Sequence, residues 1–257
     1  MKKILSIFLA SFLVFVLVIS CNKEKTIKTD YTQFVDPYIG SDYHGHVFVG
    51  ANVPFGMVQL GPNNETQGWD WCSGYHYSDS ILIGFAHTQL SGTGIGDLGD
   101  IVFMPVSDTY DPEVNADSAY NWKSKYSHDR ETVKPGYYSV HIERYNIDAA
   151  LTTSERVGFH KYQYNDNGTP GLVIDLNYGT GWDQLTAAEI EQVDGQTIRG
   201  KRFSKGWANN QQVFFYTRFS KEIQDFRILK AIDKQGVVTV LIRFEGDGEL
   251  LAKTALS

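Results

Sequence analysis

The sequence has little cysteine and no block of basic residues. Cys21 and Cys72 are the only cysteines among 257 residues, so at most one disulfide could form and the fold cannot depend on a disulfide framework. The formal charge is −7, and removal of Lys2 and Lys3 would make it more negative. Because binding to nucleic acid depends on neutralising phosphates, this balance argues against nucleic acid as a partner.

Several catalytic motifs are also missing. No G-x-S-x-G elbow occurs, and no cysteine and histidine stand at a spacing that would single them out. Gly94–Gly99 fits G-x-G-x-x-G, but a dinucleotide site needs a helix directly afterwards. Here Ile101–Met104 reads as a strand, and Asp97 and Asp100 would repel phosphate. We expect a tight glycine loop that presents carboxylates, or else a plain turn with solvated aspartates.

The N-terminus has the pattern of a signal peptide. Lys2 and Lys3 precede Ile4–Ile19, which is apolar except for two serines. This run is shorter than the roughly 20 apolar residues that a membrane-spanning helix needs. Ser20 before Cys21 resembles a bacterial lipobox, in which the cysteine is lipidated and becomes the mature N-terminus. An ordinary signal with a chance cysteine is the alternative.

The N-terminal pattern divides the chain into three parts and indicates a cellular location. We predict a signal peptide at 1–20, a polar tether at 21–30 and one β-domain at 31–257. The protein would belong to the bacterial cell envelope, in the periplasm or on the outer surface, and would contact the membrane through its lipid anchor only. With Cys21 lipidated, Cys72 has no partner, so it is a buried packing cysteine or a free thiol in a site.

Alternation of apolar and polar residues with period two predicts a β-rich fold. Only Thr186–Gln192 looks faintly helical, and Asp-Gly and Gly-Asp-Gly turns separate the apolar segments. Many strands with close turns favour an antiparallel β-sandwich over βαβ units. The predicted strands are Ile81–Thr88, Ile101–Pro105, Tyr138–Glu143, Arg156–Tyr164, Gly171–Leu176, Gln212–Phe219 and Val238–Phe244.

Two segments depart from this pattern. Residues 106–135 are polar and poor in aliphatic side chains, so we predict a long excursion over the sandwich. Residues 249–257 look like a strand still in progress, with no closing turn or polar tail. We therefore expect the sequence to be part of something longer.

Histidine and aromatic residues gather in two stretches near the N-terminus. His44 and His46 are two residues apart, and with His76 and His87 they could form a zinc site, although hydrogen bonding is the commoner role of such a pair in a loop. Residues 68–79 read GWDWCSGYHYSD. Rings stack on the C–H faces of sugars while polar edges bind the hydroxyl groups, so this stretch suits carbohydrate; the alternative is that the rings are simply core.

The order of the motifs resembles glycoside hydrolase family 92 α-mannosidases, of the kind abundant in Bacteroidetes. The similarity runs from about Asp30 to the last residue and covers the N-terminal half of such enzymes. The motifs are Val35–Gly40, His44–His46, Val53–Pro62, Gly68–Tyr77, Gly84–Thr88, Leu90–Gly94, Gly96–Asp100, Pro135–Val140, Arg156–His160 and Gly206–Asn209. Departures from the family pattern occur at Ser41-Asp42, Val47–Val49 and Ile95, and they affect the fine shape of the pocket.

The resemblance implies a fold and an activity. It implies an N-terminal β-sandwich followed by an (α/α)6 barrel, in a calcium-dependent enzyme that removes terminal α-linked mannose from glycans with inversion. The catalytic carboxylates and the calcium ligands belong mainly to the barrel, so this chain would hold no catalytic residue and would be inactive alone. The sandwich would supply a wall of the sugar pocket. The predicted substrate-binding residues are Trp71 first, with Asp70, Cys72, His76 and Trp69 near it, and more weakly His46 and His87.

Two other functions remain open. The chain could be a stand-alone mannose-binding lipoprotein without catalysis, or a non-functional gene fragment. An open reading frame of several hundred residues after Ser257, with helical repeats, would favour the enzyme.

Overall fold

The computed structural model describes residues 29–166 and 168–257. Two compact units divide the chain, Met1–Phe34 and Val35–Ser257. Of the first unit only the end is described, and it contains η1 (Tyr31–Phe34), one 3-10 turn without buried side chains.

The predicted signal peptide, most of the predicted tether and the lipidation site Cys21 lie outside the described residues. These three remain predictions. Within the part of the chain that the structure describes, no helix is long and apolar enough to cross a membrane.

The second unit is built on one large sheet of 15 strands, and the described residues contain no α-helix. The strand order is β1-β2-β4-β5-β11-β16-β12-β13-β14-β17-β10-β9-β8-β7, with β15 paired to β16 alone, while β3 and β6 form a separate pair. The strands are β1 (Ala51–Asn52), β2 (Gln59–Asn63), β3 (Ile81–Leu82), β4 (Gly84–Ala86), β5 (Val102–Val106), β6 (Ser124–Lys125), β7 (Glu131–Lys134), β8 (Tyr137–Ile142), β9 (Ile147–Thr153), β10 (Val157–Tyr164), β11 (Gly171–Asp175), β12 (Gln184–Asp194), β13 (Thr197–Lys205), β14 (Gln211–Phe219), β15 (Ile223–Ile232), β16 (Gly236–Phe244) and β17 (Glu249–Leu256).

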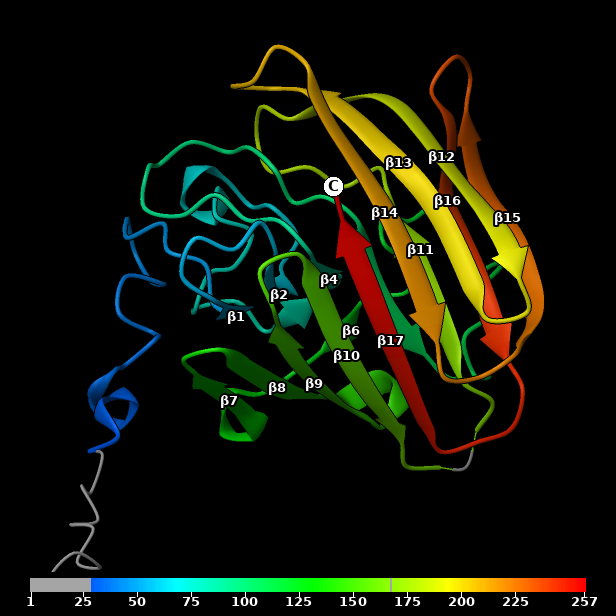
Figure 1. The fold of residues 1–257 in the computed structure, drawn as a ribbon, viewed down its shortest axis with the longest axis horizontal. Helices are drawn as coiled ribbons and strands as arrows, with labels where there is room; N and C mark the ends of the chain where they lie inside the picture. The colour runs from blue at the N-terminus through cyan, green and yellow to red at the C-terminus, as the bar shows by residue number, and fades with distance from the viewer. Residues whose placement is uncertain (1–28, 167) are drawn as a thin grey trace, which may run out of the picture. The chain divides into compact units, whose positions relative to one another are not determined.

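The sheet bends where β12 meets β16. Their contact is a single parallel pairing of Ala188 with Gly236, whereas the other named strand pairs of the sheet are antiparallel. In Figure 1 β11 lies behind β14, and β16 lies behind β12 and β13. The two layers confirm the all-β prediction of an antiparallel sandwich.

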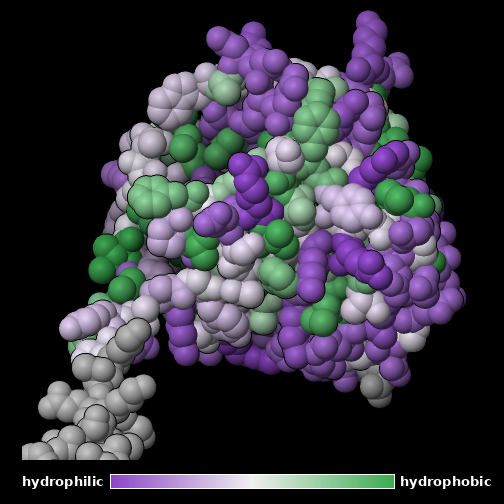
Figure 2. Space-filling model, viewed as in Figure 1, coloured by the Kyte–Doolittle hydropathy of each residue, from purple (hydrophilic) through white to green (hydrophobic). Residues whose placement is uncertain are grey.

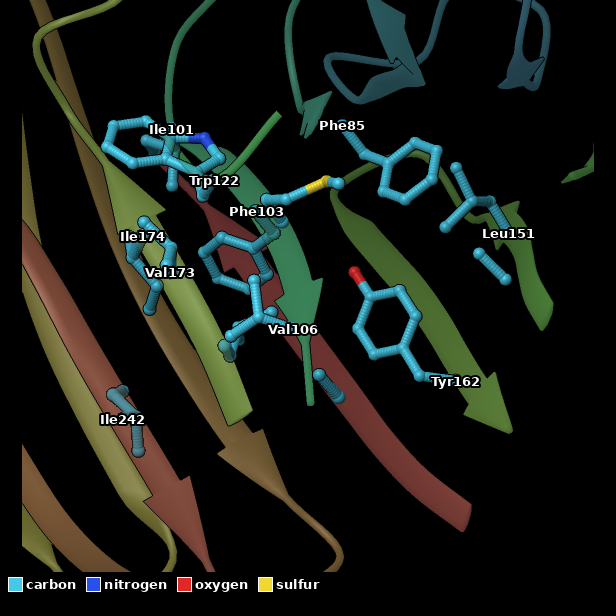
Figure 3. Close-up of a cluster of buried hydrophobic side chains, with 14 of the residues drawn as sticks. Phe85, Ile101, Phe103, Val106, Trp122, Leu151, Tyr162, Val173, Ile174 and Ile242 are labelled. Atoms are coloured by element: carbon cyan, nitrogen blue, oxygen red, sulfur yellow. The ribbon is translucent and has the colours of Figure 1, made fainter. Parts of the chain in front are cut away.

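The hydrophobic core fills the space between these layers. Every residue of β5 and of β11 is buried. In Figure 3 Phe103 and Val106 of β5 lie between Val173 of β11 and Tyr162 of β10. Such continuous burial requires cover on both faces of these strands, and the aromatic Trp122 of the polar excursion provides part of it because it belongs to the same core cluster.

The outer strands are buried on one face only. Burial alternates strictly along β17, and along most of β14, as the period-two pattern predicts. Apolar and polar side chains are intermixed on the face of the molecule seen in Figure 2.

The helical prediction for Thr186–Gln192 is wrong, because this segment lies within β12. Its weak helical pattern is overridden by antiparallel pairing with β13 along the whole hairpin and by burial of Ala188 and Ile190. The other predicted strands are found, with Ile81–Thr88 divided into β3 and β4, and the terminal segment 249–257 forms β17.

Candidate functional site

The aromatic stretch 68–79 opens with η2 (Trp69–Trp71), a single 3-10 turn. Gly68 enters it with φ 145°, and the amides of Trp71 and Cys72 donate to the carbonyls of Gly68 and Trp69 at 3.2 and 3.0 Å. A 3-10 helix has three residues per turn, so two residues turn the chain by about 240°. The side chains of Trp69 and Trp71 therefore leave the turn in different directions.

The inner half of the stretch packs against itself. The indole N–H of Trp71 donates to Asp79 Oδ2 at 2.9 Å, and its ring stacks on His76 with centroids 4.3 Å apart. His76 is buried, with Nδ1 2.8 Å from Ser78 Oγ. Cys72 is a buried free cysteine, and burial raises the pKa of its thiol. The sequence predicts Trp71 as the main sugar-stacking residue. In the structure it is half-buried, and His76 covers one face of its ring.

The outer half of the stretch faces solvent. Trp69 is 60% exposed, and its indole N–H donates to the carbonyl of Gly94 at 2.6 Å. Asp70 Oδ1 lies 2.6 Å from His44 Nδ1 and 3.2 Å from His46 Nε2. The Trp69 ring packs against both imidazoles, with centroids 4.2 Å from His46 and 5.5 Å from His44. We call Trp69, Asp70, His44 and His46 the surface cluster.

The surface cluster runs from solvent into the interior. The His44 side chain is 72% exposed, that of Asp70 27% and that of His46 only 6%. Hydrogen bonding to His44 is the main influence that lowers the pKa of the Asp70 carboxyl, with a further contribution from His46. The carboxylate is therefore charged at neutral pH and offers acceptors beside an exposed ring.

An unusual backbone conformation places the two histidines. Tyr43 and His46 have φ values of 48° and 54°, in the left-handed region that costs non-glycine residues about 1–3 kcal/mol. Gly45 between them allows no side chain, because a Cβ would lie 2.1 Å from the carbonyl oxygen of Gly40. The amide of Gly92 donates to the carbonyl of His46 at 2.5 Å and holds this conformation against the glycine loop.

Three tryptophans contact that glycine loop, residues 92–99. Trp69, Trp182 and Trp207 are 60%, 66% and 59% exposed, and each follows a glycine in the sequence. Sequence reasoning missed Trp182 and Trp207 as site residues, although the threefold Gly-Trp dipeptide was a signal for them. The contacts are Trp69 Nε1–H to Gly94 O at 2.6 Å, Trp182 N–H to Gly96 O at 3.0 Å and Trp207 N–H to Asp97 Oδ2 at 2.9 Å.

Asp97 of the loop and Asp100 directly after it are both buried, so the expectation that these aspartates are presented or solvated is wrong. Asp97 is buried and accepts from the Trp207 amide. Asp100 pairs with Arg202 at 2.6 Å, and Arg202 also pairs with Asp183, with all three side chains excluded from solvent. Removal of one partner would leave a buried charge uncompensated, so these pairs fix the loop to the turn that carries Trp182.

The four histidines of the conceivable zinc site do not meet. His44 and His46 lie together, but His76 stacks on Trp71. His87 is fully buried, with Nε2 3.0 Å from His160 Nε2, and burial lowers its pKa to about 4. The structure therefore places His87 in the core and not in the surface cluster.

The cluster of metal-ligating side chains found among the described residues does not suit calcium. Among the described residues, the one group of three neighbouring metal-ligating side chains consists of His44, His46 and Asp70. Calcium takes six to eight oxygen ligands, whereas this group offers two imidazole nitrogens and one carboxylate. The calcium ligands implied by the family resemblance remain a prediction for a region outside this chain.

Known proteins show the same fold. Residues 34–257 match the model of the glycosyl hydrolase family 92 N-terminal domain. A family GH92 alpha-mannosidase from Bacteroides thetaiotaomicron, solved in complex with mannoimidazole, is 32% identical with a TM-score of 0.78, covering 88% of this chain and 32% of that one. A family GH92 inverting mannosidase from the same organism has a TM-score of 0.71 over 90% of this chain and 32% of that one, but at 20% identity it shows the fold alone.

A curated relative matches a shorter part of the chain. The uncharacterized secreted glycosidase of Arthroderma benhamiae is 26% identical over 156 residues, which are 57% of this chain and 20% of that protein. The chain thus spans about a third of the solved relatives and a fifth of the curated one.

Proposed function

Since the chain belongs to the glycosyl hydrolase family 92 N-terminal domain family, we propose that it is the N-terminal domain of an exo-α-mannosidase and supplies one wall of its sugar pocket. The whole protein would remove terminal mannose from glycans with inversion and in a calcium-dependent way. An inverting mechanism needs a carboxylic acid and a carboxylate about 6.5–9.5 Å apart. We place both groups, together with the calcium ligands, in a C-terminal (α/α)6 domain.

One observation carries the proposal for this domain, namely the exposed Trp69 ring beside the charged Asp70 carboxylate. The ring can stack on the C–H face of a sugar while the carboxylate and the imidazoles accept or donate hydrogen bonds at its hydroxyl rim. Trp182 and Trp207 extend the exposed aromatic surface around the same glycine loop.

The predicted contacts divide by exposure. Trp69 and Asp70 have exposed groups in the surface cluster that a sugar could reach, whereas His46 is buried and holds the Asp70 carboxylate from the inner side. Trp71 keeps one ring face free of His76, so it remains a predicted stacking residue of smaller exposed area. Cys72 and His76 are buried, and they support the turn from below.

A binding titration tests the proposal. We expect methyl α-mannoside to bind the full chain weakly and Trp69→Ala to weaken that binding on the order of tenfold, because an aromatic contact contributes about 0.5–1.5 kcal/mol beyond buried area. Isothermal titration calorimetry measures both proteins. Tyr216→Ala is the matched control, because Tyr216 is a half-exposed aromatic residue on β14. Equal affinities of wild type and Trp69→Ala would remove the stacking role.

Catalysis is tested separately. We expect the 257-residue chain to release no product from an activated α-mannoside with calcium present, because its acid, base and calcium ligands are proposed to lie elsewhere. Turnover that persists through stringent purification would place catalytic carboxylates in this domain and contradict the proposal.

Attachment to the cell envelope is also a proposal. Ser20 and Cys21 after the apolar run support lipidation, and the secreted curated relative supports export. One acyl chain anchors weakly, so a diacylated Cys21 would be needed for stable attachment. We expect Cys21→Ala to move the protein to the soluble fraction of cells. Membrane retention equal to wild type would identify the uncleaved apolar segment as the anchor.

A further inference from the structure

The surface cluster contains a set of metal-ligand atoms that the sugar proposal does not use as a set. His44 Nδ1, His46 Nε2 and one oxygen of Asp70 all lie within 4.8 Å of one another. Both imidazole nitrogens approach the same carboxylate oxygen, at 2.6 and 3.2 Å. Each of these nitrogens can present a lone pair when its ring carries the proton on the other nitrogen.

We propose that His44, His46 and Asp70 form a binding site for a divalent transition metal of the zinc class. Two imidazoles and one carboxylate favour such metals, whereas calcium and magnesium favour oxygen alone. Three protein ligands also leave a coordination position open to water or to a ligand. The site is therefore separate from the calcium that the family resemblance implies.

Only small movements are needed to bind the metal. Zinc bonds of about 2.0–2.2 Å place neighbouring tetrahedral ligand atoms about 3.3 Å apart. The distance from Asp70 Oδ1 to His46 Nε2 is already 3.2 Å, and the distance to His44 Nδ1, 2.6 Å, would have to lengthen by several tenths of an ångström. His46 is held in the interior with its side chain 6% exposed, while the exposed His44 can turn toward the ion.

Trp69 supports the two imidazole ligands. Its ring packs against both of them, and its indole N–H is fixed to Gly94 at 2.6 Å. Groups that orient ligand side chains in this way strengthen metal binding. Gly94 must stay small, because a Cβ there would lie 3.0 Å from the Trp69 ring and 3.3 Å from His46 Nδ1.

A second histidine–carboxylate pair provides a control. His141 Nδ1 lies 2.7 Å from Asp148 Oδ1, which matches the contact between His44 and Asp70. That pair has a single imidazole, and the cationic Arg130 lies 3.8 Å from the same Asp148 oxygen. It therefore lacks the second nitrogen ligand, and its charge environment opposes a cation.

The test is a zinc titration of the full chain, freed of metal with a chelator and measured by calorimetry without sugar. We expect one zinc ion per wild-type chain, binding weakened more than about tenfold in both His44→Ala and Asp70→Asn, and unchanged binding in His141→Gln. His44→Ala should fold normally, because the side chain it removes is 72% exposed.

Thermal unfolding gives an independent readout. Excess zinc should raise the melting temperature of wild type and of His141→Gln but not that of His44→Ala, because a ligand stabilises only the state that binds it. No zinc uptake by wild type, equal uptake by wild type and both cluster variants, or a preference for calcium at this site would overturn the proposal. Because no sugar is present, these results are independent of the mannose-binding test.

Discussion

Histidine forms two close pairs in this domain, His44 with His46 at the surface and His87 with His160 in the core. The surface pair shares an anionic carboxylate and is partly open to solvent. The core pair has no nearby carboxylate among its hydrogen-bond partners, and burial lowers the pKa of both rings. The same side chain is therefore available to ligands in one place and locked in a neutral form in the other.

The hydrogen bonds of the core pair define its tautomers. The carbonyl of Ile101, 2.6 Å from His87 Nδ1, can only accept, so Nδ1 carries the hydrogen and Nε2 must accept. His160 Nε2 then donates across the 3.0 Å contact to His87 Nε2. The hydroxyl of Tyr162 in turn donates to His160 Nδ1 at 2.7 Å. Each buried nitrogen is satisfied in one arrangement, which suits a structural role.

The largest expected effect comes from breaking the core pair. His160→Ala should destabilise the domain by about 3–5 kcal/mol, because it leaves a cavity and deprives His87 and Tyr162 of a partner. His44→Ala should change stability by less than about 0.5 kcal/mol. Denaturant unfolding of both variants measures the difference. Similar losses in the two variants would show that the pairs do not differ as described.

Trp71 and Trp69 show the same contrast between a structural and an exposed side chain, within a single 3-10 turn. Trp71→Ala should cost about 2–3 kcal/mol, because the buried carboxylate of Asp79 loses an indole donor and His76 loses its stacking partner. Trp69→Ala should leave stability nearly unchanged and weaken sugar binding. Thermal unfolding and sugar titration on the same preparations separate the roles. Unchanged stability with lost sugar affinity in Trp71→Ala would instead assign Trp71 to the sugar, as the sequence predicted.

Acid should destabilise the domain through the buried histidines of the core pair. Because the pKa of His87 falls from 6.5 to about 4 on folding, the unfolded chain binds more protons between those values. Stability should therefore be complete above about pH 6.5 and decrease as pH falls, by about 1.4 kcal/mol per unit for each such histidine. The lowered pKa of Asp70 acts only below its usual value of 3.8.

Urea unfolding between pH 7 and pH 4.5 measures this slope. The slope should be the same in wild type and in His44→Ala, since His44 lies outside the core pair. A flat profile in wild type, or a slope that His44→Ala abolishes, would contradict the assignment of the pH dependence to the buried rings.

Local patterns in the sequence predict most of the fold. Strands such as β14 and β17 alternate because one face is buried, and that alternation is visible in the residues themselves. The helical prediction for Thr186–Gln192 failed because this segment is a strand only through its pairing with β13. The residues of β13 lie outside the short segment on which the prediction rested.

The site is harder to predict because it is assembled from separate loops. The pair His44 and His46 could be recognised from its spacing, but the contribution of Asp70 arises only from the folded turn. Likewise Trp182 and Trp207 reach the glycine loop from segments about 90 and 110 residues further along the chain, a proximity that only the folded sheet creates.

The most direct test of the account is the behaviour of the tryptophan indole groups when sugar is added. The chain has five tryptophans, so a nitrogen-15 spectrum resolves five indole N–H signals, and loss of one signal in Trp69→Phe identifies that residue. Trp122 is the internal control, because it is buried with its N–H bonded to the carbonyl of Ile83 at 2.9 Å. We predict that methyl α-mannoside shifts the Trp69 signal and leaves the Trp122 signal in place. A stationary Trp69 signal at saturating sugar would contradict the claim that this surface binds mannose.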